Sequence, residues 1–289
     1  MHCKHCDYAL WNLRDRICPE CGNAFLPSEY EFVPNSIRFC CTECGQDYYG
    51  VDDKGHLVPT EFDCVRCGSP QRMDDMLVLP TEGVTEEQAL LLGDVTATGY
   101  FCAEQAGIHA DGIYAVVGCG PVGIMAVIGA RHLGAEMIYA VDTIPERLEL
   151  ARKAGAVPID FNSEDPVLVL HDAAEGRGAD AVMEAVGSFA SHRSAIELVR
   201  PGGTISSVGV HTETAFAFTP AEAYDKNLTY KVGRCPARVY MERLAPFVRD
   251  GQLDISGVIS HRFPLERGPE AYRLFDERRD QCTKVLLTP

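Results

Sequence analysis

The sequence predicts an α/β protein in which a doubly wound parallel sheet follows a small cysteine-rich domain. Three observations support this prediction. Cysteines are concentrated in the first 67 of the 289 residues, short apolar runs alternate with helical segments from residue 112 onward, and a glycine-rich turn joins the first such run to the first such helix. Strands that alternate with helices in this way favour a parallel sheet covered on both faces.

The composition indicates a globular protein that does not bind nucleic acid. Hydrophobic residues make up 46% of the chain and charged residues 24%, which is ordinary for a soluble protein. No stretch approaches the roughly 18 apolar residues that span a bilayer, and the N-terminus lacks the apolar core of a signal peptide, so we expect a cytoplasmic protein without a membrane partner. The net charge of −16 disfavours contact with a phosphate backbone.

Residues 1–72 are predicted to form a double zinc ribbon. The chain has 13 cysteines, and nine of them lie in the first 67 residues, mostly in Cys-x-x-Cys pairs. Without an export signal, this spacing favours metal binding over disulfides. Eight thiolates make two four-sulfur sites, the number that closes the tetrahedral shell of zinc. The predicted ligands are Cys3, Cys6, Cys18, Cys21, Cys41, Cys44, Cys64 and Cys67.

The order in which these pairs combine stays open. Sequential pairing gives C-x2-C-x11-C-x2-C and C-x2-C-x19-C-x2-C, and an interleaved pairing is the alternative. Three pairs are followed by Gly, which we expect to take a positive φ so that backbone N–H groups point at the sulfurs. Cys40 is then spare, and His2, His5 and His56 are expected to face solvent. Because a closed four-thiolate site has no open position, both zinc ions are predicted to be structural.

The rest of the chain divides into three predicted segments. Residues 73–111 are expected to hold a strand that leads through Pro80 and Gly83 into a turn, and then one or two helices with Thr85 as N-cap. Residues 112–260 are predicted to form the large domain, and residues 261–289 a C-terminal helix and strand. Within the large domain we expect strands at 113–118, 137–142, 156–160, 179–187 and 202–210, and helices at 121–133, 145–154, 164–175 and 189–199.

The turn at residues 118–123 has the spacing G-x-G-x-x-G and lies between a predicted strand and a predicted helix. Gly118 would make the tight turn, Gly120 would let a pyrophosphate approach the backbone, and Gly123 would let the helix pack on the strand. With Pro121 and Val122, these residues would bind the pyrophosphate at the helix N-terminus, where free N–H groups favour an anion. The pattern predicts a Rossmann dinucleotide-binding domain.

Asp142 indicates which dinucleotide binds. It ends the next predicted strand, nineteen residues after Gly123. Its carboxylate would accept hydrogen bonds from the adenosine ribose and repel a 2′-phosphate. Thr143 and Ile144 follow, and we expect no arginine in position to receive that phosphate. The predicted cofactor is therefore NAD rather than NADP.

Residues 73–289 resemble the zinc-dependent alcohol dehydrogenases of the medium-chain dehydrogenase/reductase superfamily, nearest to the formaldehyde-dehydrogenase-like branch. The resemblance rests on GDVTATGYFCAE, VVGCGPVGIMAV, AVDTIPERLELARKAGA, EAVGS, VRPGGTISSVGV and EAYRLFDERRDQCTKVLLTP. It implies a six-stranded Rossmann sheet, a C-terminal segment that returns to the catalytic side, and a homodimer formed through the cofactor domain.

The resemblance also implies roles for single residues. Thr98 would lie under the nicotinamide, and Val208 and Val210 would face its carboxamide. Lys284 matches a basic position near the pyrophosphate. Asp94 matches a carboxylate ligand of the catalytic zinc, and the alternative for Asp94 is an acid that caps a helical turn.

The sequence departs from this family before residue 73. In the family, a GroES-like β domain supplies a Cys and a His to the catalytic zinc, together with a proton-relay hydroxyl, and residues 1–72 do not carry that pattern. Two functions therefore stay open. One is an NAD-dependent oxidoreductase acting on an alcohol or aldehyde, its site completed by His56, Cys40 or another subunit. The other is a non-catalytic NAD-binding protein whose zinc ribbons form an interaction module.

Overall fold

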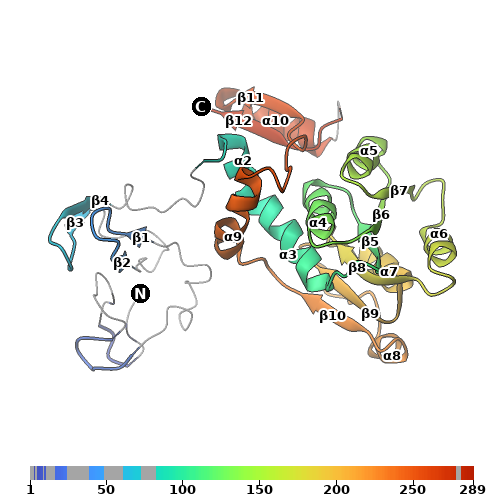
Figure 1. Ribbon diagram of the computed structural model, residues 1–289, viewed down its shortest axis with the longest axis horizontal. Helices are drawn as coiled ribbons and strands as arrows, with labels where there is room; N and C mark the ends of the chain where they lie inside the picture. The colour runs from blue at the N-terminus through green and yellow to red at the C-terminus, as the bar shows by residue number, and fades with distance from the viewer. Residues whose placement is uncertain are drawn as a thin grey trace. The chain divides into compact units, whose positions relative to one another are not determined.

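The alternating apolar runs of the sequence form a six-stranded parallel sheet in the computed structural model (Figure 1). The structure describes residues 3, 5–8, 10, 17–24, 39–48, 61–72, 83–277 and 281–289. They divide into two units, Met1–Glu82 and Gly83–Pro289. The strand expected in residues 73–82, and the predictions for His2, His56 and the side chain of Cys40, lie outside the described residues.

The first unit consists of short hairpins that each enclose one Cys-x-x-Cys turn. Strand β1 (Phe39–Cys40) pairs antiparallel with β2 (Asp47–Tyr48), and β3 (Glu61–Asp63) pairs antiparallel with β4 (Pro70–Arg72). A single bridge between Ile17 and Ala24 flanks a further turn in the same way. The first cysteine of each pair is buried, at Cys3, Cys18, Cys41 and Cys64.

The sheet of the second unit has the order β10-β9-β8-β5-β6-β7, and every neighbouring pair is parallel. This is the strand order of a doubly wound dinucleotide-binding fold. The Rossmann-like prediction is confirmed. The strands are β5 (Ile113–Val117), β6 (Met137–Asp142), β7 (Val157–Asp160), β8 (Ala179–Glu184), β9 (Val199–Ser207) and β10 (Thr229–Val232).

Helices cover both faces of this sheet, because its strands alternate between two apolar cores. Tyr114 and Val116 of β5 belong to one core, and Ala115 and Val117 belong to the other. The first core is shared with α4 (Pro121–His132), α5 (Pro145–Lys153) and α9 (Ala237–Arg249). The second is shared with α6 (Pro166–Ala173) and α7 (Phe189–Leu198), with α8 (Pro220–Asp225) at its edge.

The residues that precede the sheet form a helical run with one irregular turn. Helix α2 (Glu86–Leu91) continues through the π-helical turn η2 (Leu92–Thr96) into α3 (Ala97–Ala106). Thr85 is the N-cap, as predicted: its hydroxyl accepts from the backbone N–H of Gln88 at 3.2 Å. Asp94 lies in the π turn, and such turns are frequent at functional sites.

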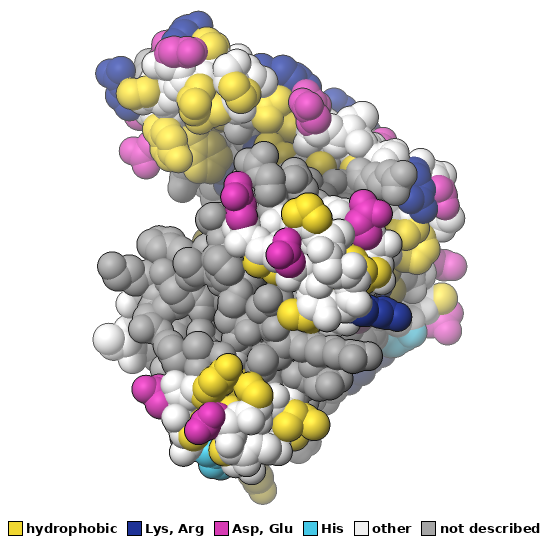
Figure 2. Space-filling model, turned by 90° about the vertical axis from the view of Figure 1, so that its left-hand side faces the viewer, with side chains coloured by type: hydrophobic (Ala, Val, Ile, Leu, Met, Phe, Trp, Pro, Cys, Tyr) yellow, Lys and Arg dark blue, Asp and Glu magenta, His cyan; other side chains and the backbone are white. Residues whose placement is uncertain are grey.

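A small C-terminal lobe completes the second unit. Strand β11 (His261–Pro264), the turn η3 (Leu265–Arg267), helix α10 (Gly268–Asp276) and β12 (Val285–Thr288) form it, with β11 and β12 parallel. Helix α10 buries Ala271 and Leu274 and leaves Tyr272 exposed. Figure 2 shows the lobe at its top, where apolar side chains lie among acidic and basic ones. None of the helices that the structure describes could cross a bilayer.

Candidate functional site

The eight predicted metal ligands form two separate clusters. In each cluster the four sulfur atoms lie within 4.8 Å of one another. The first cluster contains Cys3, Cys6, Cys18 and Cys21, and the second contains Cys41, Cys44, Cys64 and Cys67. The sequential pairing is therefore the one that the structure adopts, and the interleaved alternative is wrong.

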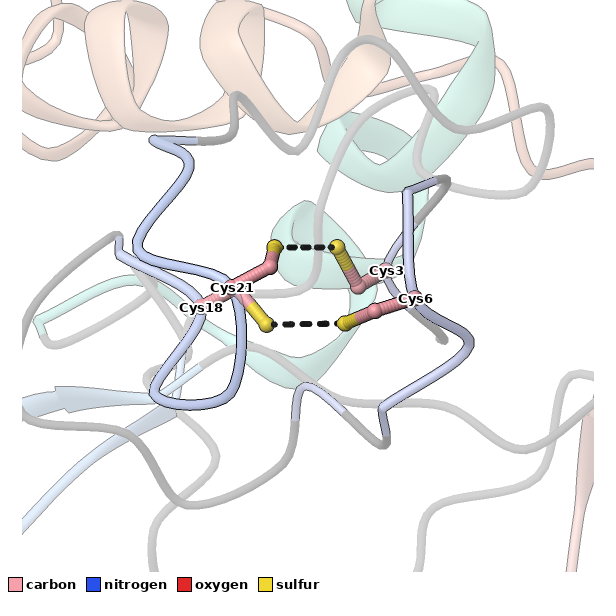
Figure 3. Close-up of side chains that lie close together, drawn as sticks. All are labelled: Cys3, Cys6, Cys18 and Cys21. Atoms are coloured by element: carbon pink, nitrogen blue, oxygen red, sulfur yellow. Dashed lines mark hydrogen bonds between the residues drawn. The ribbon is translucent and has the colours of Figure 1, made fainter.

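The sulfur positions in both clusters suit a tetrahedral zinc ion. Figure 3 shows Cys3 facing Cys21 and Cys6 facing Cys18, with Sγ–Sγ distances of 3.6 Å and 3.4 Å. In the second cluster the Cys41–Cys67 and Cys44–Cys64 distances are 3.6 Å and 3.7 Å. Zinc–sulfur bonds of about 2.3 Å at tetrahedral angles separate the sulfurs by about 3.8 Å. Each cluster can hold one structural zinc.

The same backbone turn is repeated at all four cysteine pairs. The N–H of the first cysteine donates to the carbonyl five residues later, and its own carbonyl accepts from the N–H four residues later. The residue at that fourth position is left-handed in each turn: Asp7, Gly22, Gly45 and Gly68 have φ of 59°, 74°, 69° and 73°. The positive φ expected of the three glycines is confirmed, and Asp7 adopts it in the turn that lacks a glycine.

Polar side chains next to the sulfurs support both clusters. Hydrogen bonds from Asn23, above all from its backbone N–H, lower the pKa of the Cys21 thiol to about 6, which favours the thiolate that zinc binds. At the second cluster the buried amide of Gln71 accepts from the backbone N–H of Thr42 at 2.9 Å and donates to Ser69 Oγ at 2.8 Å. The Ser69 hydroxyl lies 3.0 Å from Cys67 Sγ. These bonds connect the two hairpins of that cluster.

A cleft of about 490 Å³ opens at the carboxyl ends of β5, β6 and β8. Ligands bind at this edge in open α/β sheets. Gly118, Gly120 and Pro121 line it on one side and Asp142 on another. Val122 instead packs against the first core. The sequence motif and the cleft therefore coincide.

Each glycine of the turn meets a different constraint. Gly118 has φ of 91°, and a Cβ there would lie 2.3 Å from Val186. A Cβ on Gly123 would lie 1.8 Å from the Gly118 carbonyl oxygen, so this position lets helix and strand pack closely. A Cβ on Gly120 would meet no atom nearer than 3.9 Å. Gly120 therefore leaves space at the N-terminus of α4, where no side chain caps the helix.

Asp142 holds the backbone around the cleft. One carboxylate oxygen accepts from the N–H of Cys119 at 2.7 Å, and the other accepts from Thr143 at 2.7 Å and Ile144 at 3.0 Å. Asp142 thereby connects the end of β6 to the glycine turn. A carboxylate that accepts three hydrogen bonds keeps a lone pair for a ribose hydroxyl.

One arginine bears on the expectation that none is in position to receive a 2′-phosphate. Arg147, in the first turn of α5, lines the same cleft and places Nη1 3.9 Å from Asp142 Oδ2. Its Nε is buried without a hydrogen-bond partner. Arg147 follows Asp142 by five residues in the sequence. The first turn of α5 brings its side chain back to the end of β6. The cleft thus offers a cation as well as an anion.

Three residues that the resemblance assigns to the cofactor, Val208, Val210 and Lys284, are not among those that line the cleft. The N–H groups of Val208 and Gly209 donate to the carbonyl of Glu184 at 3.0 Å and 3.4 Å, so this segment adjoins the end of β8. The side chain of Val210 is 78% exposed. Lys284 directly precedes β12, where its carbonyl accepts from the N–H of Ser260, and it does not line the cleft. Their cofactor contacts stay predictions.

Asp94 and Thr98 lie together, one helical turn apart, and the Thr98 hydroxyl is 3.4 Å from Asp94 Oδ1. Cys235 lies against them: burial raises the pKa of its thiol to about 12, with the charge of Asp94 adding to the effect. In the sequence Cys235 is an isolated cysteine 137 residues after Thr98, so no spacing pattern could reveal this contact. Among the described residues, Asp94 belongs to no cluster of three potential metal ligands.

The second unit is thus a Rossmann-like α/β domain with a cleft at its switch point, preceded by two four-cysteine clusters. Residues 121–248 match the family model of zinc-binding dehydrogenases. The zinc-type alcohol dehydrogenase B of Aspergillus flavus is 38% identical over 268 residues, which is 87% of this chain and 62% of that protein. An alcohol dehydrogenase of Cupriavidus necator is 35% identical over 225 residues, 76% of this chain and 61% of that one.

A solved structure agrees with these relatives. Alcohol dehydrogenase TADH from Thermus sp. ATN1 superposes with a TM-score of 0.69 at 37% identity, covering 76% of this chain and 63% of that one. These comparisons support a protein that resembles the zinc-type alcohol dehydrogenases of the medium-chain dehydrogenase/reductase superfamily. The chain spans about three fifths of the length of these relatives.

Proposed function

We propose that this protein is an NAD(H)-binding oxidoreductase that interconverts an alcohol and an aldehyde or ketone, with two structural zinc ions in its ribbon unit. Bound NAD would accept the hydride from the alcohol. The chain's own contribution would be to hold the pyrophosphate at the N-terminus of α4 and the adenosine ribose at Asp142. The family of the relatives supports the alcohol or aldehyde as substrate.

The observation that carries the proposal is the open space over Gly120. Pro121 occupies the first helical position, and the next N–H groups of α4 have neither a side-chain cap nor a bonded carbonyl. These groups and the positive end of the helix suit a diphosphate. A diphosphate in that space could approach the backbone closely, which a Cβ at Gly120 would hinder.

A second function is favoured by the position of Asp94. Acidifying an alcohol hydroxyl needs a Lewis acid, and three protein ligands usually hold such a zinc. Asp94 belongs to no group of three potential ligands among the residues that the structure describes. The alternative is therefore a non-catalytic NAD-binding protein in which the zinc ribbons form an interaction module. Oxidation of alcohols or reduction of aldehydes by the purified full chain distinguishes the two.

The cofactor proposal is tested with Gly120→Ala. The new methyl group would make only one ordinary contact, at 3.9 Å from Arg147 Nη1, so the fold should be unchanged while the space for the pyrophosphate is filled. NADH binding, measured by the enhancement of its fluorescence, should weaken at least tenfold. Gly268→Ala is the matched control, because its Cβ would also make only an ordinary 3.8 Å contact, far from the cleft in sequence. Equal NADH affinity in the two variants would contradict the proposal.

A further inference from the structure

Three side chains with metal-binding atoms meet at the carboxyl end of β8, and neither the ribbons nor the proposed cofactor contacts use them. Glu184 is the last residue of β8, His192 lies in the first turns of α7, and His211 follows the Val208–Val210 segment. One ligand atom from each lies within 4.8 Å of the other two. Glu184 and His192 are buried, and the side chain of His211 is 28% exposed.

The distances in this cluster are too long for hydrogen bonds. Glu184 Oε2 lies 3.6 Å from His192 Nδ1 and 3.5 Å from His211 Nε2. A nitrogen–oxygen hydrogen bond would be about 2.7–3.2 Å long. Ligands bound to one tetrahedral zinc at about 2.0–2.1 Å lie about 3.3–3.5 Å apart. The spacing is therefore that of neighbouring ligands around a common ion.

His192 is oriented as a metal ligand. Its Nε2 lies 2.9 Å from the Tyr230 hydroxyl, which can accept the ring N–H. The other nitrogen, Nδ1, is then a lone-pair donor, and it is buried without a hydrogen-bond partner. Metal-binding histidines usually donate their second ring nitrogen to an oxygen in this way.

Glu184 supplies the negative charge. Burial would raise the pKa of this acid, but its hydrogen bonds outweigh burial and the pKa is lowered. Oε1 accepts from the N–H groups of Val186 at 2.8 Å and Gly187 at 2.7 Å, and Oε2 accepts from the Ser207 hydroxyl at 2.8 Å. Oε2 keeps a second lone pair, on the side of the two histidines.

We propose that Glu184, His192 and His211 bind a divalent transition-metal ion of the zinc class, with a fourth position open to solvent. Two imidazoles and a carboxylate suit zinc, and three protein ligands are typical of an open rather than a closed site. Because His211 belongs to the segment after β9, the ion would hold that segment against β8 and α7. This site is independent of the eight cysteines and of Asp94.

Cobalt provides the test, since Co²⁺ reports its ligands by colour. Full-length protein whose cysteine sites hold zinc is titrated with Co²⁺. Wild type should bind one Co²⁺ per chain and gain visible d–d bands without the near-ultraviolet thiolate charge-transfer band. His211→Ala should reduce Co²⁺ affinity at least tenfold, and it is the least disruptive change because this side chain is partly exposed. His171→Ala, also exposed and outside the cluster, is the matched control and should bind as wild type does.

Two results would overturn the proposal. The first is that wild type binds Co²⁺ only by displacing zinc from the cysteine sites. The near-ultraviolet thiolate charge-transfer band would identify such displacement. The other is a visible spectrum and affinity that His211→Ala leaves unchanged. If Glu184→Gln folds, as far-ultraviolet circular dichroism would show, it should lose the site as His211→Ala does.

Discussion

Replacing Gly22 with alanine tests whether the backbone of the cysteine turns determines zinc affinity. Gly22 has φ of 74°, and a Cβ there meets nothing within 4 Å, so the cost of alanine is conformational alone. A left-handed L residue costs about 1–2 kcal/mol. The smaller entropy of the unfolded alanine chain offsets about 0.4–1 kcal/mol of this. The net loss of about 1 kcal/mol weakens zinc binding at the first cluster about fivefold.

The assay is competition for zinc between the full-length protein and a chromophoric chelator. Gly68→Ala is the matched control, because Gly68 has φ of 73° and equally open surroundings but belongs to the second cluster. Each variant should weaken one of the two zinc ions and leave the other unchanged. Unchanged affinity in Gly22→Ala would refute the conformational argument, and equal weakening of both ions would refute the assignment of Gly22 to one cluster.

Four further predictions concern the metal and cofactor sites. Cys18→Ser should release about one zinc per chain, measured by elemental analysis, and leave NADH binding unchanged, because that turn lies in the other unit. Asp142→Ala should weaken NADH about tenfold or more in calorimetry, since a hydrogen bond to a charged group is worth about 1.5–3 kcal/mol, and Arg147→Gln should weaken NADPH more than NADH. Asp94→Ala should leave the zinc content unchanged and alter any alcohol turnover little; loss of a zinc ion on this change would show that Asp94 is a ligand.

Regular periodicity allowed most of the second unit to be predicted from the sequence. The predicted strand 137–142 is β6, and the predicted helix 121–133 is α4 with one residue fewer. The strand predicted at 202–210 is β9, which instead spans Val199–Ser207. Its register with β8 jumps from Val199 to Thr204, so the Pro-Gly-Gly stretch bulges out within the strand instead of preceding it.

The ribbon ligands were predictable as a set but not as pairs. Connections of 11 and 19 residues between Cys-x-x-Cys turns are long enough for either combination, so spacing alone could not decide. The left-handed conformation of the residue after each second cysteine was predictable where that residue is glycine. Asp7 concealed it in the first turn, because aspartate tolerates the same conformation at a moderate cost.

Contacts between distant elements could not be predicted. Arg147 lies near Asp142 because of the first turn of α5. Cys235, which lies just before α9, contacts Asp94 from a part of the chain far away in sequence. Glu184 and His211 come from the end of one strand and the segment after the next. The proximity of Glu184 and His211 follows from the parallel register of β8 and β9, which no sequence spacing shows.

Calorimetric titration of the zinc-loaded full chain with NADH, and in parallel with NADPH, measures the central claim most directly. The cleft at Gly120 and Asp142 predicts one NADH site per chain, with NADH bound more tightly than NADPH. Absence of NADH binding at millimolar concentration, in protein that holds its two ribbon zinc ions, would contradict the account.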